Sequence, residues 1–169
     1  MSNPLLDTSG LPNFDAIKPQ HALPALQELI AAHRQKLADI LAQPDAHDCA
    51  SLITPMEEMS HELSRVWSPI GHLQSVLDDP AWRDAYNESL PLLTEHGTEL
   101  SQNNELQKAY SQVSDNLPAD ADPALRALIE QELHPRSKEV HFLLQCGQMR
   151  TLALATVLED AYSGALDRD

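Results

Sequence analysis

Apolar residues recur at intervals of three and four along most of the chain, which is the spacing of one face of an α-helix. The first such run follows Pro24 and is closed by Gln43-Pro44-Asp45. A proline in the first turn suits a helix start, because the N–H that it lacks would have no helical partner there. The apolar positions of this predicted helix are Leu26, Leu29, Ile30, Leu37, Ile40 and Leu41.

A second helical run extends from about Ser51 to Leu77, and Pro69 in its interior is expected to kink or split it. Asp79-Pro80 then has the form of an N-cap followed by a first-turn proline, which predicts the start of a third element. Helical spacing continues from there to Val113. The places where an interruption is expected are Pro91 and Gly97.

The segment 117–123 has the composition of a loop and ends in a second Asp-Pro start signal, Asp122-Pro123. The helix that follows is predicted to carry Leu125, Leu128, Ile129 and Leu133 on one side and to be stopped by Pro135. No alternating strand pattern and no fixed-period repeat is present. The sequence therefore predicts an all-α fold, an antiparallel array of helices with short connections.

Composition is that of a soluble globular protein with one main core: 169 residues, 42% hydrophobic and 22% charged. The formal net charge is −15, from 26 acidic and 11 basic residues. A phosphate backbone or an anionic membrane surface would be repelled, so neither nucleic acid nor a membrane is predicted as a partner. Most of the acidic residues are expected on solvated helix faces, although such a surface could also favour basic ligands.

The two cysteines, Cys49 and Cys146, are far apart and belong to no metal-binding or redox motif, so we interpret them as reduced thiols. The first residues have neither the basic segment nor the apolar run of an export signal. No stretch approaches the roughly 18 apolar residues of a membrane helix. The predicted location is the cytoplasm.

One string invites a catalytic interpretation, His61-Glu62-Leu63-Ser64-Arg65. Zinc peptidases use HExxH to place two imidazoles on one helix face, with the glutamate polarising the metal-bound water. Here Arg65 stands where the second histidine would be, and an arginine is always protonated and has no lone pair to give a metal. Glu88 lies near the spacing of a third ligand, but one histidine and one glutamate do not make the site. No catalytic, cofactor-binding or metal-binding residue is therefore predicted in this chain.

The remaining candidates are weaker. The eight histidines show no repeated ligand spacing, and most are expected at the surface; they are His21, His33, His47, His61, His72, His96, His134 and His141. A helical-bundle metal site would need paired Glu-x-x-His motifs on facing helices, and the chain has only Glu58-Met59-Ser60-His61.

Met56, Met59 and Trp67 are spaced so that they could line a groove for peptides, although core packing is the favoured interpretation. Trp82 and Tyr86 form an i, i+4 pair that is expected to pack against a neighbouring helix.

Several longer segments resemble the start of zinc oligopeptidases of the thimet and oligopeptidase A family. The matching segments keep their order and spacing over residues 1 to about 133: Asn3-Pro4-Leu5-Leu6, Leu11-Pro12 with Phe14, Ile17-Lys18-Pro19-Gln20-His21, Trp67 to Val76, Arg83-Asp84-Ala85-Tyr86, Leu90-Pro91-Leu92-Leu93 and Lys108-Ala109-Tyr110. This ordered set is far more specific than any short motif.

The resemblance implies that residues 1–133 form an amino-terminal helical domain. In the family such a domain makes one wall of a deep channel that admits short peptides, and the zinc site with its HExxH helix lies in a distant part of the chain. Short peptides are thus the implied partners of the complete enzyme. The chain alone, with no HExxH and no predicted cofactor, is expected to be inactive.

Residues 134–169 do not match the family and are treated as a divergent tail. The acidic excess is confined almost entirely to the residues before it, and its apolar positions could form one helix face: Val140, Leu143, Leu144, Leu154, Val157, Leu158 and Ala161. The favoured hypothesis is a truncated oligopeptidase, by a frame shift or otherwise. The alternative is a stand-alone helical module that binds peptides or a partner protein.

Overall fold

Five α-helices and three short helical turns make up the computed structural model, which describes residues 3–7, 9–43, 47–77 and 79–133. The helices are α1 (Ala22–Leu41), α2 (Thr54–Leu77), α3 (Pro80–Ser101), α4 (Asn104–Asp115) and α5 (Pro123–Leu133). The turns are η1 (Pro4–Leu6), η2 (Pro19–His21) and the π-helical η3 (Cys49–Ile53). Over these ranges no strand occurs, and the predicted all-α class is confirmed.

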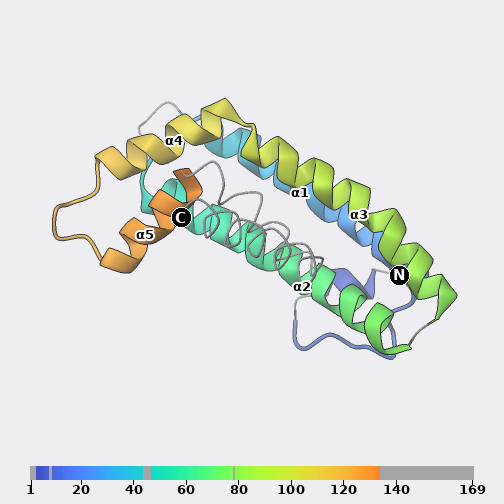
Figure 1. Cartoon of the computed structure of the whole chain (residues 1–169). Helices are drawn as coiled ribbons and strands as arrows, with labels where there is room; N and C mark the ends of the chain where they lie inside the picture. Colours follow the sequence, from blue (N-terminus) through green and yellow to red (C-terminus); the bar gives the residue numbers. More distant parts are fainter. Residues whose placement is uncertain (1–2, 8, 44–46, 78, 134–169) are drawn as a thin grey trace, which may run out of the picture.

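The three long helices run up, down and up (Figure 1). α2 is antiparallel to both of its neighbours, whereas α1 and α3 lie side by side and point the same way. Across this contact, Arg34 on α1 donates from Nε and an Nη to the two carboxylate oxygens of Glu99 on α3, each at 2.8 Å. α4 continues beyond the end of α3, and α5 folds back to pack against α4 (Figure 1).

Two of the predicted helix starts are confirmed at the level of single hydrogen bonds. The Asp79 carboxylate accepts from the Ala81 N–H at 2.8 Å, and the Asp122 carboxylate accepts from the Ala124 N–H at 2.8 Å. α1 begins two residues before Pro24, directly after η2, and still keeps that proline within its first turn. The second helical run starts close to Ser51, with η3 leading into α2.

The expected interruption at Pro91 or Gly97 is wrong, because α3 continues through both residues. Pro69 likewise does not split α2. The break between α3 and α4 comes instead at Gln102 and Asn103, where the Asn103 side chain accepts from the Leu106 N–H at 3.0 Å and caps α4. Buried side chains before and after each proline stabilise the helix by more than the loss of the single backbone hydrogen bond that the proline removes.

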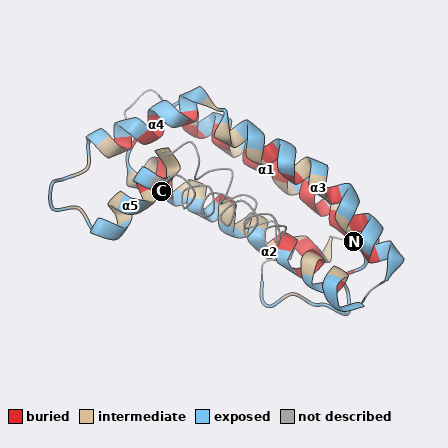
Figure 2. Ribbon diagram, in the orientation of Figure 1, coloured by how far each residue is buried: buried red, intermediate tan, exposed pale blue. Residues whose placement is uncertain are grey.

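The buried side chains form two clusters along the bundle, on the inner sides of the helices (Figure 2). The first core cluster lies toward the amino-terminal end and includes Ile17, Leu26, Ile30, Val66, Trp67, Ile70, Trp82 and Leu93. The second core cluster lies where α4 and α5 pack and includes Leu37, Ile40, Leu52, Ile53, Met59, Leu106, Tyr110, Val113 and Ile129.

The expected packing of Trp82 and Tyr86 is confirmed: Trp82 is buried, and Tyr86 stacks on Trp67 of α2 with ring centroids 4.7 Å apart. Cys49 is a free thiol, half-buried in η3. The tail 134–169, with Cys146, His134 and His141, lies outside the described residues, so its predictions and the domain boundary stay predictions.

Candidate functional site

The residues of the HExxH-like string point to three different places. His61 is exposed on α2. Glu62 faces α1 and accepts a hydrogen bond from Nε2 of His33 at 2.9 Å. Arg65 donates to the Gly10 carbonyl at 2.8 Å and so ties the amino-terminal segment to α2. Glu88 is exposed on α3. Within the described ranges, no three His, Cys, Asp or Glu side chains come together in a way that could hold a metal ion.

Buried histidines are the feature that the sequence interpretation missed. Among the six described histidines, His33, His47 and His96 are buried, so the expectation of a surface position is wrong for these three, while His61 and His72 are exposed. The spacing of the apolar residues around two of them already indicated a buried position. His33 is in helical register with the apolar positions 26, 30 and 37 of α1, and His96 with positions 93 and 100 of α3.

His33 and His96 meet across the α1–α3 contact, with ring centroids 6.1 Å apart. They are 3% and 4% exposed, and Nδ1 of His96 is buried without a hydrogen-bond partner in the described part of the chain. Burial lowers the pKa of His33, and the hydrogen bond that its ring donates to Glu62 opposes this only in part. Burial, with a smaller contribution from His33, lowers the pKa of His96 to about 4. Both rings are therefore neutral at pH 7.

A pocket of about 120 Å³ opens beside this pair, between the long helices and the α4–α5 hairpin. All five helices contribute to its walls. The apolar lining comes from Met56, Met59, Leu63, Leu100 and Leu106, and the polar lining from His33, His96, Glu57, Ser60, Ser101, Tyr110 and Glu132. The favoured interpretation, core packing, is confirmed for Met59 and Trp67, which are buried in the second and first core clusters, and Met56 packs against the second cluster. Met56 and Met59 also border this cavity.

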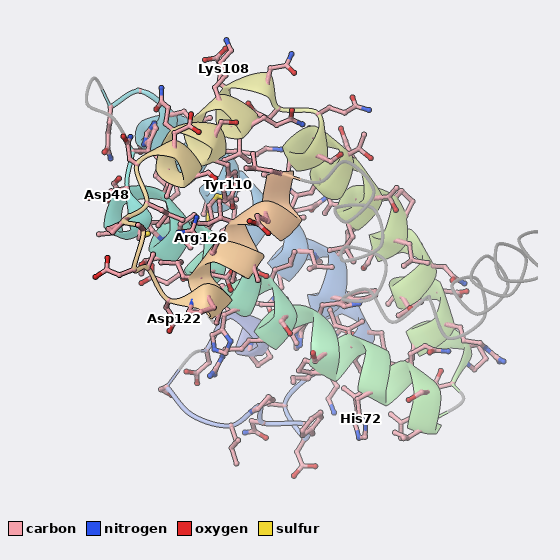
Figure 3. All side chains as sticks on the ribbon, turned by 60° about the vertical axis from the view of Figure 1, so that its left-hand side comes forward. Asp48, His72, Lys108, Tyr110, Asp122 and Arg126 are labelled. Atoms are coloured by element: carbon pink, nitrogen blue, oxygen red, sulfur yellow. The ribbon has the colours of Figure 1, made fainter. Side chains whose placement is uncertain are left out.

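The charge in this pocket is negative. Glu57 and Glu132 contribute carboxylates, and none of the described residues that line it is a lysine or an arginine. Figure 3 shows Tyr110 on the inner side of α4, beside α5, while Lys108 on the same helix projects outward. Burial raises the pKa of the Tyr110 hydroxyl, and Glu132 and Glu57 raise it further, so both carboxylates act on the same interior point.

Residues 26–139 match the model of the amino-terminal domain of neurolysin and thimet oligopeptidase. The chain belongs to this family. It is 40% identical to oligopeptidase A of Haemophilus influenzae over 134 residues, which is 79% of this chain and 20% of that protein. It is 37% identical to oligopeptidase A of Escherichia coli over 115 residues, 68% of this chain and 17% of that protein.

A plant relative, described as a probable cytosolic oligopeptidase A of Arabidopsis thaliana, is 29% identical over 115 residues, 68% of this chain and 16% of that protein. The chain thus matches about a fifth, or less, of the length of these relatives. Its match to the oligopeptidase family concerns the helical amino-terminal domain, in agreement with the resemblance seen in the sequence and with the helical fold. Across the described residues, no helix is both long and apolar enough to cross a membrane.

Proposed function

We propose that this chain supplies the amino-terminal helical wall of the peptide channel of a zinc-dependent oligopeptidase and contributes no zinc ligand. The observation that carries the proposal is the match of residues 26–139 to the amino-terminal domain of the family, together with 40% identity to a bacterial oligopeptidase A. Peptide hydrolysis by metal-activated water is then the task of a separate part that bears the HExxH helix.

The chemistry of residues 61–65 supports the proposal that this chain contributes no zinc ligand. A zinc ligand pair at i and i+4 needs two lone-pair donors on one helix face. Here Arg65 occupies the second position and its guanidinium is engaged with the Gly10 carbonyl. Glu62, the residue in the place of a general base, is held by buried His33. The cytoplasm remains the proposed location.

A complementation assay tests this function. The chain is mixed with the remainder of a bacterial oligopeptidase A that lacks its own amino-terminal domain but retains HExxH, and hydrolysis of a quenched fluorogenic peptide is followed with and without zinc. We expect neither part to hydrolyse the peptide alone and the zinc-loaded mixture to do so. Robust zinc-dependent hydrolysis by the 169-residue chain alone would overturn the assignment, as would a mixture no more active than the remainder.

A further inference from the structure

The pocket between the long helices and the α4–α5 hairpin carries an inference of its own. We propose that it binds a basic side chain of an oligopeptide, with the aliphatic stem against the apolar wall and the cationic group between Glu57 and Glu132. The proposal deepens the proposed function, on which it rests for the peptide nature of the ligand, by naming the class of peptide that this domain selects.

Shape and polarity are the first support. The lining combines apolar side chains, among them Met56, Met59 and Leu100, with the acidic residues Glu57 and Glu132. An arginine or lysine side chain likewise combines an apolar part with a polar part, because its methylene stem packs against apolar surface while its charged head remains polar. Methionine side chains are flexible and adapt to stems of different length.

Charge is the second support. An anionic or carboxylate-ended ligand would meet two acidic side chains and no lining lysine or arginine among the described residues. The nearby histidines do not offset this, because burial keeps them neutral at pH 7. A guanidinium or ammonium group is attracted under the same conditions, because its hydrogen bonds to a carboxylate join two opposite charges.

His96 is the third and independent support. Its side chain is 4% exposed, it lines the pocket, and its buried Nδ1 has no hydrogen-bond partner among the residues that the structure describes. A buried polar group without a partner is costly and uncommon in a folded protein. A neutral imidazole keeps one lone pair, which can accept a hydrogen bond from an N–H of the ligand.

The test measures peptide binding to the full 169-residue chain by fluorescence polarisation. The probe is a labelled octapeptide with one arginine among leucine, glycine and serine, and the comparison peptides carry glutamine or glutamate in place of the arginine. We expect the arginine peptide to bind at least about tenfold more tightly than the glutamine peptide, and the glutamate peptide to bind most weakly. Equal affinity for the three, or no binding of the arginine peptide, would overturn the proposal.

Matched variants separate the pocket from general attraction to an acidic protein. Glu57→Gln with Glu132→Gln removes the two pocket carboxylates, whereas Glu58→Gln with Glu130→Gln makes the same charge change at neighbouring positions that do not line the pocket. We expect about a tenfold loss of affinity for the first pair and less than about a twofold loss for the second. An equal loss in both pairs would show nonspecific attraction and would contradict the proposal.

Ring signals in NMR spectra locate the ligand without any substitution. On titration with the arginine peptide, the His33 and His96 signals should shift while those of His61 and His72 stay in place. Shifts confined to His61 and His72 would place the peptide elsewhere and overturn the site. Binding and complementation can fail separately: a chain that complements the zinc-bearing part but shows no arginine preference loses only this inference.

Discussion

At the scale of single residues, His96 couples folding to pH. Its pKa is about 4 in the folded protein and near 6.5 when the chain is unfolded. Between these values the unfolded state binds more protons, so stability rises with pH and is lost as the pH falls from about 6.5 toward 4. Each unit of pKa difference corresponds to about 1.4 kcal/mol. The pKa of His33 is lowered as well, so it acts in the same direction.

We therefore expect the free energy of unfolding in urea to fall by about 2 kcal/mol more between pH 7 and pH 5 in the wild-type protein than in His96→Phe. The phenylalanine fills the same space but cannot take up a proton. His61→Phe, at an exposed position of α2, serves as the control and should retain the wild-type pH dependence. Parallel pH profiles for wild type and His96→Phe would contradict the assigned burial of this ring.

Glu62 offers a second test at this scale. Glu62→Ala removes the hydrogen-bond partner of the His33 Nε2 atom and leaves a buried polar group unsatisfied. We expect a loss of about 1 to 2 kcal/mol in the free energy of unfolding, measured in urea at pH 7. His61→Ala, one residue earlier and exposed, should change it by less than about 0.5 kcal/mol. If the two variants lose equal stability, Glu62 has no special structural role.

The absence of a zinc ligand pair at residues 61–65 could be predicted from the sequence, but the contacts of these residues could not. Arg65 alone argues against a zinc ligand pair, because that argument needs only the chemistry of the residue. The partners of Glu62 and Arg65 could not be predicted, since His33 and Gly10 lie 29 and 55 residues away along the chain. Such contacts depend on how helices pack, which periodicity does not specify.

At the scale of elements, α3 shows how packing overrides local signals. Pro91 lies in the interior of this helix and is exposed, so it removes a backbone hydrogen bond without adding to the core. Leu93 and His96, just beyond it, are buried and hold the helix in place. The Asp-Pro starts were predictable because the cap and the proline act within one turn. The continuity through Pro91 was not, because it depends on contacts with α1 and α2.

Pro91→Ala should therefore stabilise the protein, by about 1 kcal/mol or more, since it supplies an N–H to the carbonyl four residues earlier and a better helix former. Pro80→Ala makes the same chemical change in the first turn of α3, where no helical hydrogen bond is missing. It should leave the urea midpoint nearly unchanged. An unchanged midpoint for Pro91→Ala would mean that the helix backbone around this residue has adapted to the proline.

At the scale of the whole molecule, the net charge of −15 opposes compaction. Eleven basic residues cannot pair with 26 acidic ones, and exposed ion pairs such as Lys108–Glu105 contribute little each. Added salt should then weaken the repulsion between the acidic residues by more than it weakens the attraction within ion pairs.

We expect the free energy of unfolding in urea to rise by roughly 1 kcal/mol when NaCl is raised from about 0.05 M to about 0.5 M, because the screening length shortens severalfold. Urea is the suitable denaturant, since it adds no ions. Sodium sulfate at equal ionic strength provides a comparison for effects beyond screening. A midpoint that falls with NaCl would show that attractive pairs, chiefly Arg34–Glu99, dominate the electrostatics.

The all-α class followed from periodicity, but the separation of α3 from α4 at Gln102 and Asn103 and the parallel course of α1 and α3 did not. Short connections predict that helices adjacent in sequence are antiparallel, and this holds for α1 with α2 and for α2 with α3. The contact between α1 and α3 joins helices separated by a whole element. It creates both the Arg34–Glu99 pair and the meeting of His33 with His96, so the pocket could not be derived from local pattern.

The two core clusters differ in one respect that affects how the protein can be observed. Both tryptophans of the chain, Trp67 and Trp82, belong to the first core cluster, and the second core cluster contains Tyr110 but no tryptophan. Tryptophan emission therefore reports on one end of the bundle. Circular dichroism in the far ultraviolet reports on every helix. If the α4–α5 end loosens first, ellipticity will decline while the emission maximum stays fixed, and the order of the two signals will identify the end that opens.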